Sequence, residues 1–241
     1  MSPIIIYVLF LCYLYDAFNR LIVSPLFKLN LTMVDSSYTG SFSAGSLFHK
    51  ETNALLPLLL NVNSQALLKK EIQQNDLLKI NSESSRKRTV SEIVKRFNHT
   101  ESSFWDYYIN RNEEEQKILL FFQCLKVYRL MFDFHFNVTV KQWNSSTPLV
   151  EPYLYQMELN EIAGRDEKVY NWSDLTKAKV ISVYMRILKD IDMLDPKSLR
   201  LKSVSADPHF FSYFIKIKEA WFLDACLLNA QMKKQIINSA L

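Results

Sequence analysis

The chain has 241 residues, of which 49% are hydrophobic and 22% are charged, a composition typical of a globular protein with a sizeable core. It contains only 3 glycines, which argues against a glycine-rich phosphate loop and against a fold rich in strands. The formal net charge of +4 is too small to indicate a nucleic-acid ligand by itself. The positions of the basic residues are therefore more informative than their number.

The sequence has no motif typical of an enzyme. It contains no P-loop, GxSxG, HExxH or CxxC pattern, so we expect neither catalysis nor a bound cofactor or metal. Cys12, Cys124 and Cys226 lie far apart in apolar surroundings, which predicts buried thiols in a reducing compartment rather than disulfides or a zinc site. His135 stands between two phenylalanines, and we interpret it as a core residue.

Residues 1–32 form an apolar N-terminal extension with three interpretations. It is a membrane-associated segment, an additional helix packed on the domain, or sequence upstream of a true start at Met33. The uninterrupted apolar run, 3–15, is shorter than the roughly 20 residues of a bilayer span, and Asp16 and Arg20 interrupt its continuation. A polar turn after Met33 favours the third interpretation. We therefore expect a cytoplasmic protein, with inner-membrane association through 1–32 as the alternative.

Residues 33–110 are predicted to form an N-terminal helical region. A helix capped by Ser43 or Ser46 runs to about Leu60, with Pro57 as a possible kink. A second helix covers 64–74, one helical turn covers 76–81, and a third helix runs from a serine cap near 82 to about 97. An aromatic segment follows at 101–108.

The helix expected at 82–97 carries a basic stripe. Val90, Ile93, Val94 and Phe97 share one apolar face, and the opposite face aligns Arg88, Ser91 and Lys95. Arginine, lysine and serine all donate hydrogen bonds to phosphate oxygens. The helix is therefore the reading helix of a first helix-turn-helix, or an ordinary solvated basic face. The predicted DNA-binding residues of this segment are Arg86, Lys87, Arg88, Ser91 and Lys95.

Residues 111–241 are predicted to form a C-terminal helical region. A long helix begins at Glu113 and runs to about 137, with 138–143 continuing it or turning away. A further helix covers 151–163 and ends at Gly164. Another starts at Asp207-Pro208, and the last covers 219–232, with a frayed tail beyond it.

The segment from 164 to 205 combines a turn, a capped helix and a basic hairpin. Ser173 is an N-cap residue type, and an apolar arc from Leu175 to Leu188 predicts a largely buried helix. The one polar stripe of that helix and the outward positions of the hairpin at 197–203 supply the remaining predicted DNA contacts: Lys179, Ser182, Arg186, Lys189, Lys197, Arg200 and Lys202. This arrangement indicates a winged helix-turn-helix. The alternatives are a core helix with solvated lysines and an edge strand protected by charge.

Several of these segments resemble the BrxA family of bacteriophage exclusion (BREX) defence systems. The resemblance includes YTGSFSAGSLF at 38–48, the SRKRT segment and LLFFQCLKVYRLMFDF at 119–134. It continues through the acid-rich turn ending at Trp172, the helix containing RILKDIDML and the closing LRLKSV, and so covers about 33–226. The apolar residues 1–32 and Pro57 depart from the family pattern. The resemblance implies an all-helical protein with two helix-turn-helix motifs that binds double-stranded DNA without catalytic activity.

The sequence therefore predicts an all-α fold, a compact globular helical domain with two winged-helix-like helix-turn-helix motifs and at most one short β-hairpin. We expect a non-enzymatic, double-stranded DNA-binding component of a bacterial phage-defence system, with other BREX proteins as possible partners. The alternatives are a protein-interaction or scaffold subunit of the defence complex, and a membrane-anchored helical protein.

Overall fold

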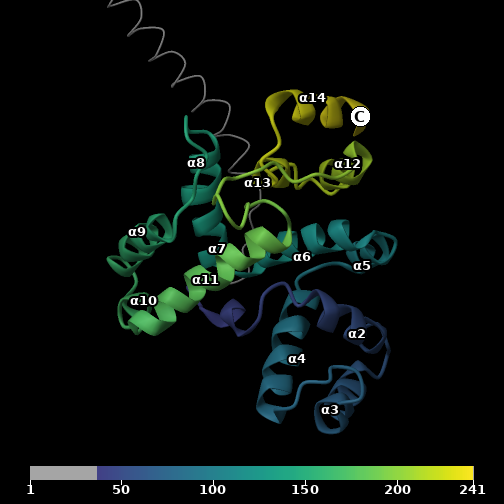
Figure 1. The fold of residues 1–241 in the computed structure, drawn as a ribbon. Helices are drawn as coiled ribbons and strands as arrows, with labels where there is room; N and C mark the ends of the chain where they lie inside the picture. Colours follow the sequence, from purple (N-terminus) through teal and green to yellow (C-terminus); the bar gives the residue numbers. More distant parts are fainter. Residues whose placement is uncertain (1–36, 241) are drawn as a thin grey trace, which may run out of the picture. The chain divides into compact units, whose positions relative to one another are not determined.

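The structure is a computed structural model that describes residues 37–240, all within the compact unit Met33–Leu241. The predictions for residues 1–32, for Cys12 and for a start at Met33 lie outside the described residues. The described part of the chain is helical, and its only β pairing consists of two isolated antiparallel bridges. This arrangement confirms the predicted all-α fold (Figure 1).

The first half of the described chain contains a short 3-10 helix and five longer helices, in the order η1(Ser41–Ala44), α2(His49–Leu59), α3(Ser64–Gln74), α4(Glu83–Phe97), α5(Ser102–Ile109) and α6(Glu113–Val127). The second half continues as α7(Arg129–Asp133), η2(Phe134–Val140), α8(Lys141–Trp143), α9(Pro152–Ala163), α10(Glu167–Tyr170), α11(Asp174–Asp190), α12(Pro208–Lys216), α13(Phe222–Ala225) and α14(Ala230–Ala240). None of the helices in 37–240 has the length and apolar character that a membrane span requires.

Helices α2, α3 and α4 pack on one another around a small apolar core (Figure 1). The buried side chains of this core come from all three helices and from the loops between them: Phe48, Leu55, Leu59, Leu68, Leu78, Val90 and Ile93. The segment 75–82 between α3 and α4 is not the helical turn that the sequence predicted. The Glu71 carboxylate accepts hydrogen bonds from the N–H groups of Leu77 (3.0 Å) and Leu78 (2.9 Å) and so holds this segment in an irregular conformation.

Helix α2 begins later than predicted and without a serine cap. Its N-cap residue is Phe48, in the left-handed region at φ 59°, and no side chain caps the helix. The Phe48 ring lies against Gly45, where a Cβ atom would come within 2.2 Å of it. The turn between η1 and α2 therefore needs a glycine at position 45, because any side chain there would displace a buried ring.

The long helix predicted from 113 breaks at Tyr128. The backbone of Tyr128 is extended (φ −114°, ψ 103°), and α6 ends one residue before it. The helix restarts as α7 and passes through the π-helical η2 into α8. The Tyr128 hydroxyl donates to Glu92 (2.7 Å) and accepts from Arg96 (3.0 Å), both on α4. These contacts with α4 hold Tyr128 where a continuous helix would not place it.

A buried polar network joins η2, α9 and α11. The Tyr184 hydroxyl lies 2.8 Å from His135 Nδ1 and 2.8 Å from Thr139 Oγ1, and Thr139 Oγ1 is 2.8 Å from the Tyr155 hydroxyl. The other ring nitrogen of His135 is 2.8 Å from the Ala225 carbonyl oxygen. His135 is fully buried, as predicted, and burial lowers its pKa to about 4 despite the opposing hydrogen bond with Ala225.

The C-terminal residues form a packed helix rather than the predicted frayed tail. Helix α14 lies along α12 (Figure 1) and buries Ile236. The predicted helix over 219–232 is instead divided into α13 and the start of α14. The predicted start of α12 at Asp207-Pro208 is confirmed, since the Asp207 side chain caps the helix. Cys124 and Cys226 are buried free thiols, as expected.

Candidate nucleic-acid interface

Helix α4 is covered on two sides and exposes one narrow stripe. Val90 and Ile93 are buried, as expected, and pack beside α2 and α3. Thr89, Glu92 and Arg96 are buried as well. The Ser82 hydroxyl accepts from the N–H of Ser85 and begins the helix. The exposed stripe consists of Ser84, Lys87, Arg88 and Ser91, with the half-buried Lys95 below them.

The predicted contacts on α4 differ in their surroundings. Arg88 and Ser91 are exposed, whereas Lys87 forms an exposed ion pair with Glu83 at 2.7 Å. The Lys95 ammonium lies 5.3 Å from the centre of the Tyr128 ring. Lys87, Arg88 and Ser91 are therefore accessible to a ligand, and Lys95 is partly accessible.

The position of Arg86 corrects the predicted set of DNA-binding residues. Its side chain is buried, with 7% of the residue exposed. Its guanidinium donates to the carbonyl oxygens of Ile72 (2.7 Å), Ile80 (2.6 Å) and Asn81 (3.0 Å). Arg86 holds the α3–α4 connection together and has no free face for a phosphate.

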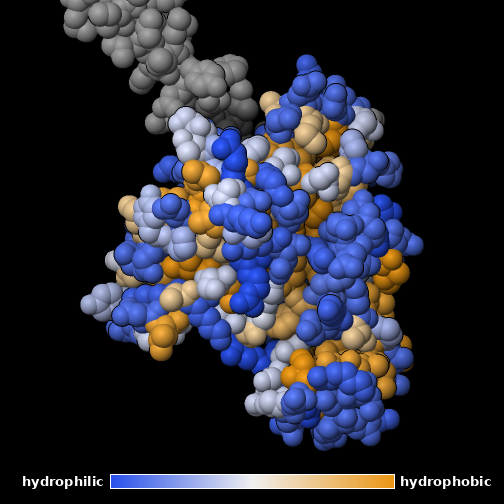
Figure 2. All heavy atoms as spheres, in the orientation of Figure 1, coloured by the Kyte–Doolittle hydropathy of each residue, from blue (hydrophilic) through white to orange (hydrophobic). Residues whose placement is uncertain are grey.

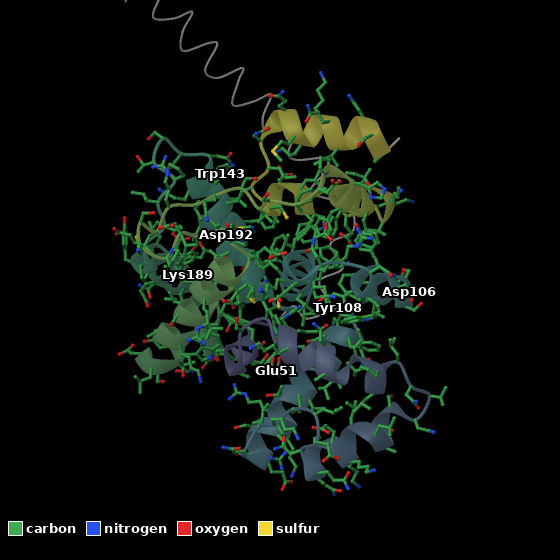
Figure 3. The ribbon with its side chains drawn as sticks, turned by 45° about the vertical axis from the view of Figure 1, so that its right-hand side comes forward. Glu51, Asp106, Tyr108, Trp143, Lys189 and Asp192 are labelled. Atoms are coloured by element: carbon green, nitrogen blue, oxygen red, sulfur yellow. The ribbon has the colours of Figure 1, made fainter. Side chains whose placement is uncertain are left out.

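Helix α11 repeats this arrangement. The Ser173 hydroxyl accepts from the N–H of Thr176 and begins the helix as predicted. The apolar residues from Val180 to Leu188 are buried, while Lys179, Ser182, Arg186 and Lys189 are exposed. Lys189 lies at the C-terminal end of the helix near Asp192 (Figure 3). In Figure 2 the visible face of α11 carries both hydrophilic and apolar residues.

The exposure of Leu175 corrects the predicted buried face of α11. The sequence placed it at the start of the buried arc of α11, but 84% of the residue is exposed. Ala178, one turn further on, is exposed too. Both lie on the same side of the helix as the basic residues, so the exposed stripe begins with apolar side chains.

The second arm of the basic hairpin after α11 also pairs with the segment before α9. The sequence did not predict this pairing. Leu194 pairs with Leu201, and Arg200 pairs with Leu149, which precedes α9. The N–H of Leu201 donates to the Pro148 carbonyl at 2.8 Å, and the N–H of Val150 donates to the Leu199 carbonyl at 3.0 Å. No local pattern in 148–150 indicates this pairing, because the partner lies about fifty residues further along the chain.

The tip of the hairpin is a tight turn around Asp195. The N–H and hydroxyl groups of Ser198 donate to the Asp195 carboxylate at 2.7 and 2.8 Å. These hydrogen bonds lower the pKa of Asp195. Lys197 and Arg200 project into solvent beside this turn, whereas Lys202 is half-buried and paired with Asp192 at 2.5 Å. Lys197 and Arg200 are therefore the accessible cations of the hairpin.

Helix η1 lies between the two basic helices and contacts both. The Ser41 hydroxyl donates to Glu92 on α4 at 3.3 Å, and the Ser46 hydroxyl donates to Asp190 on α11. Gly40 lies against Val180, where a Cβ atom would come within 3.1 Å. The 38–48 segment thus ties α4 and α11 to a single short element.

One cavity near these elements is lined by several acidic side chains. It has a volume of about 400 Å³, and its lining includes Glu114, Glu115, Asp190, Asp192 and Asp207. Within residues 37–240 no group of three or more His, Cys, Asp or Glu side chains is arranged to hold a metal ion. In contrast to this cavity, the two basic stripes and the hairpin present exposed cations, which attract anionic ligands.

These features define an all-α protein with two basic helix stripes and a short basic hairpin. The family model of BrxA matches residues 36–218, so the chain belongs to the BrxA family of BREX phage-defence proteins. The chain is 23% identical over 192 residues to the BREX protein BrxA of Paramagnetospirillum magneticum. The aligned region covers 79% of this chain and 96% of that protein. It also shares its fold with an uncharacterized protein from Magnetospirillum magneticum whose crystal structure has been solved. That likeness has a TM-score of 0.67 at 23% identity and covers 78% of this chain and 97% of the other.

Proposed function

We propose that this protein is a non-enzymatic, double-stranded DNA-binding component of a BREX phage-defence system, and that α4 and α11 are the helices that meet the DNA. Its membership of the BrxA family supports a place in that system. The observation that carries the DNA-binding part is the repeated stripe. Arg88, Ser91 and Lys95 on α4 have the same spacing as Lys179, Ser182 and Arg186 on α11, and in both helices about half of the remaining residues are buried.

The order of elements around each stripe supports two helix-turn-helix motifs. Helices α2, α3 and α4 form one three-helix group, and α9 packs against both α10 and α11 in a second group. The second group is followed by the hairpin with Lys197 and Arg200, which is bridged to the segment before α9. We assign this hairpin as the wing of a winged helix-turn-helix, which would contact the DNA backbone beside the recognition helix.

The charges of the two stripes fit a phosphate backbone. Within the described residues Arg88, Lys179, Arg186, Lys189, Lys197 and Arg200 are exposed cations that take part in no ion pair. Exposed cations can release the counterions condensed on DNA, and this release drives binding without reading the base sequence. We expect contacts with about five phosphates, and thus a slope of about −4 to −5 when log K is plotted against log salt concentration.

The first experiment measures the affinity of the folded protein for a 30-base-pair duplex at several salt concentrations. A slope near the expected value supports the proposal. An affinity that does not depend on salt, or no binding at low salt, contradicts it.

The second experiment reverses four charges on the proposed surface, with Arg88, Lys179, Arg186 and Arg200 each changed to Glu. All four side chains are exposed, so the variant should remain folded, and it should lose DNA binding at a salt concentration where the wild type is saturated. The control variant changes the exposed Lys141, Lys216, Lys218 and Lys234 to Glu. It alters the net charge by the same amount on other elements, and it should keep most of the affinity. Equal binding by the two variants would show that the surface is wrong.

The competing function is that of a protein-interaction subunit whose basic faces meet acidic partners. It predicts weak, non-saturating DNA binding and stable co-purification with other proteins of the defence system. Loss of that co-purification in the four-site variant, without saturable DNA binding by the wild type, would favour it.

A further inference from the structure

The exposed stripe of α11 contains two apolar side chains that its solvent position does not explain. Leu175 lies in the first turn of α11 with 84% of the residue exposed, and Ala178 is exposed one turn later. In Figure 2 an apolar patch lies over the end of α11 next to α10. A leucine this exposed gains nothing from folding, because burial of apolar surface is what stabilises such a side chain.

Leu175 lies in line with the basic residues. It precedes Ser182 by seven residues and Arg186 by eleven, which are close to two and three turns of a helix with about 3.6 residues per turn. The three side chains therefore point in nearly the same direction. At about 1.5 Å per residue, Leu175 and Arg186 are separated by about 16 Å along the helix axis, which is comparable with the roughly 12 Å width of the DNA major groove.

The corresponding stripe on α4 has no apolar residue. Ser84 and Lys87 stand seven and four residues before Ser91, as Leu175 and Ala178 stand seven and four residues before Ser182. The two helices thus present the same spacing with different chemistry. Every member of the α4 stripe donates hydrogen bonds, whereas the N-terminal half of the α11 stripe presents methyl groups.

We propose that Leu175 and Ala178 contact the C5-methyl group of a pyrimidine in the major groove, so that α11 reads a base edge while α4 holds the DNA backbone. This inference rests on the proposed DNA-binding function. The C5-methyl group of thymine is the one apolar group that the four base pairs present in the major groove. In a helix-turn-helix the N-terminal residues of the recognition helix are the ones that reach the base edges.

The charges around Leu175 support DNA as the occupant. Lys179 lies one turn away, and Arg186 and Lys189 follow on the same side, so an apolar protein surface docked here would have to cover cations without partners, which is costly. Asp174, exposed beside Leu175, would be repelled by a phosphate. The N-terminal end of α11 therefore suits the base edges, and its C-terminal half suits the flanking phosphates.

The test compares pairs of duplexes that differ only in C5-methyl groups. One pair contains thymine or deoxyuridine opposite adenine, and a second pair contains 5-methylcytosine or cytosine opposite guanine. The wild type should bind each methylated duplex about fourfold more tightly for one buried methyl group. A preference in the first pair alone would assign the contact to thymine, and a preference in both pairs would assign it to the C5-methyl group of either base.

The Leu175→Ala variant should lose this preference while it keeps the salt dependence of the wild type, because leucine carries no charge. The matched control is Ser84→Ala at the corresponding position of α4, which should keep the preference for the methylated duplex. Both residues are exposed, so neither variant should unfold, and thermal unfolding checks this.

Equal affinity of the wild type for methylated and unmethylated duplexes would overturn the inference and leave the proposed DNA binding in place. An undiminished methyl preference in Leu175→Ala would overturn it also. No saturable binding to any duplex would contradict the proposed function itself. Loss of a co-purifying protein in Leu175→Ala, with the methyl preference unchanged, would assign the residue to a protein interface instead.

Discussion

The buried guanidinium of Arg96 offers a direct test of how the two basic helices are joined. The residue is 2% exposed, and its side chain connects α4 with the turn before α2 and with the break after α6. It donates to the Leu47 carbonyl at 2.8 Å, the Ser46 carbonyl at 3.2 Å and the Tyr128 hydroxyl at 3.0 Å. It also lies 5.0 Å from the centre of the Phe48 ring.

Replacement of Arg96 by Ala would remove all of these contacts together. A buried acceptor left without a donor costs about 1–3 kcal/mol, and here the carbonyls of Leu47 and Ser46 lose their donor. The Glu92 carboxylate keeps its hydrogen bond from the Tyr128 hydroxyl at 2.7 Å but loses the attraction of the buried Arg96 charge. Leaving a buried charge without its opposite charge costs about 3–5 kcal/mol. Because these effects overlap, we expect Arg96→Ala to lower the free energy of unfolding by about 3–5 kcal/mol.

Urea unfolding followed by circular dichroism measures this loss. Arg96→Lys keeps the charge but replaces the planar fork by a single ammonium group, so its loss should fall between that of Arg96→Ala and zero. Arg88→Ala on the exposed side of the same helix is the control and should change the free energy of unfolding by no more than about 0.5 kcal/mol. If Arg96→Ala were as stable as Arg88→Ala, the network would not hold α4 to α2 and α6.

Two further predictions concern the core. Burial lowers the pKa of His135 to about 4, against about 6.5 in the unfolded chain. Between these pH values the unfolded state therefore binds more protons than the folded state. The free energy of unfolding should fall as the pH falls through this window, by up to about 1.4 kcal/mol per pH unit. The slope of the urea-derived free energy between pH 6.5 and 4.5 should decrease in His135→Gln, and an unchanged slope would show that His135 is not its source. On α14, Ile236→Ala should cost about 2–5 kcal/mol because the side chain is 1% exposed, whereas Ile237→Ala, 40% exposed, should cost less than about 1 kcal/mol. Equal losses in this pair would mean that α14 does not pack on α12 as described.

Local sequence patterns predicted the helices whose buried and exposed faces follow from the spacing of apolar residues within the helix itself. The bounds of α3, α4, α11 and α12 follow from caps and apolar periodicity, and these helices are close to their predicted positions. The same periodicity placed Arg88, Ser91, Lys179, Ser182 and Arg186 in solvent, as the structure does. The family was also recognisable from short segments spread over the chain.

The sequence by itself therefore determined the helical class, the family and the exposed stripes, because each depends on residues that are close in sequence. The tertiary structure alone decided which polar residues are buried and stabilise the fold. Arg86 is buried because its guanidinium donates to carbonyl oxygens of α3 and of the α3–α4 loop. Tyr128 breaks a long helix because its hydroxyl bonds to Glu92 and Arg96 on α4. Likewise, Leu175 is exposed because no element within residues 37–240 buries it, and the hairpin pairs with 148–150. Contacts between distant segments decide these features, and a local pattern carries no information about where a distant segment will lie.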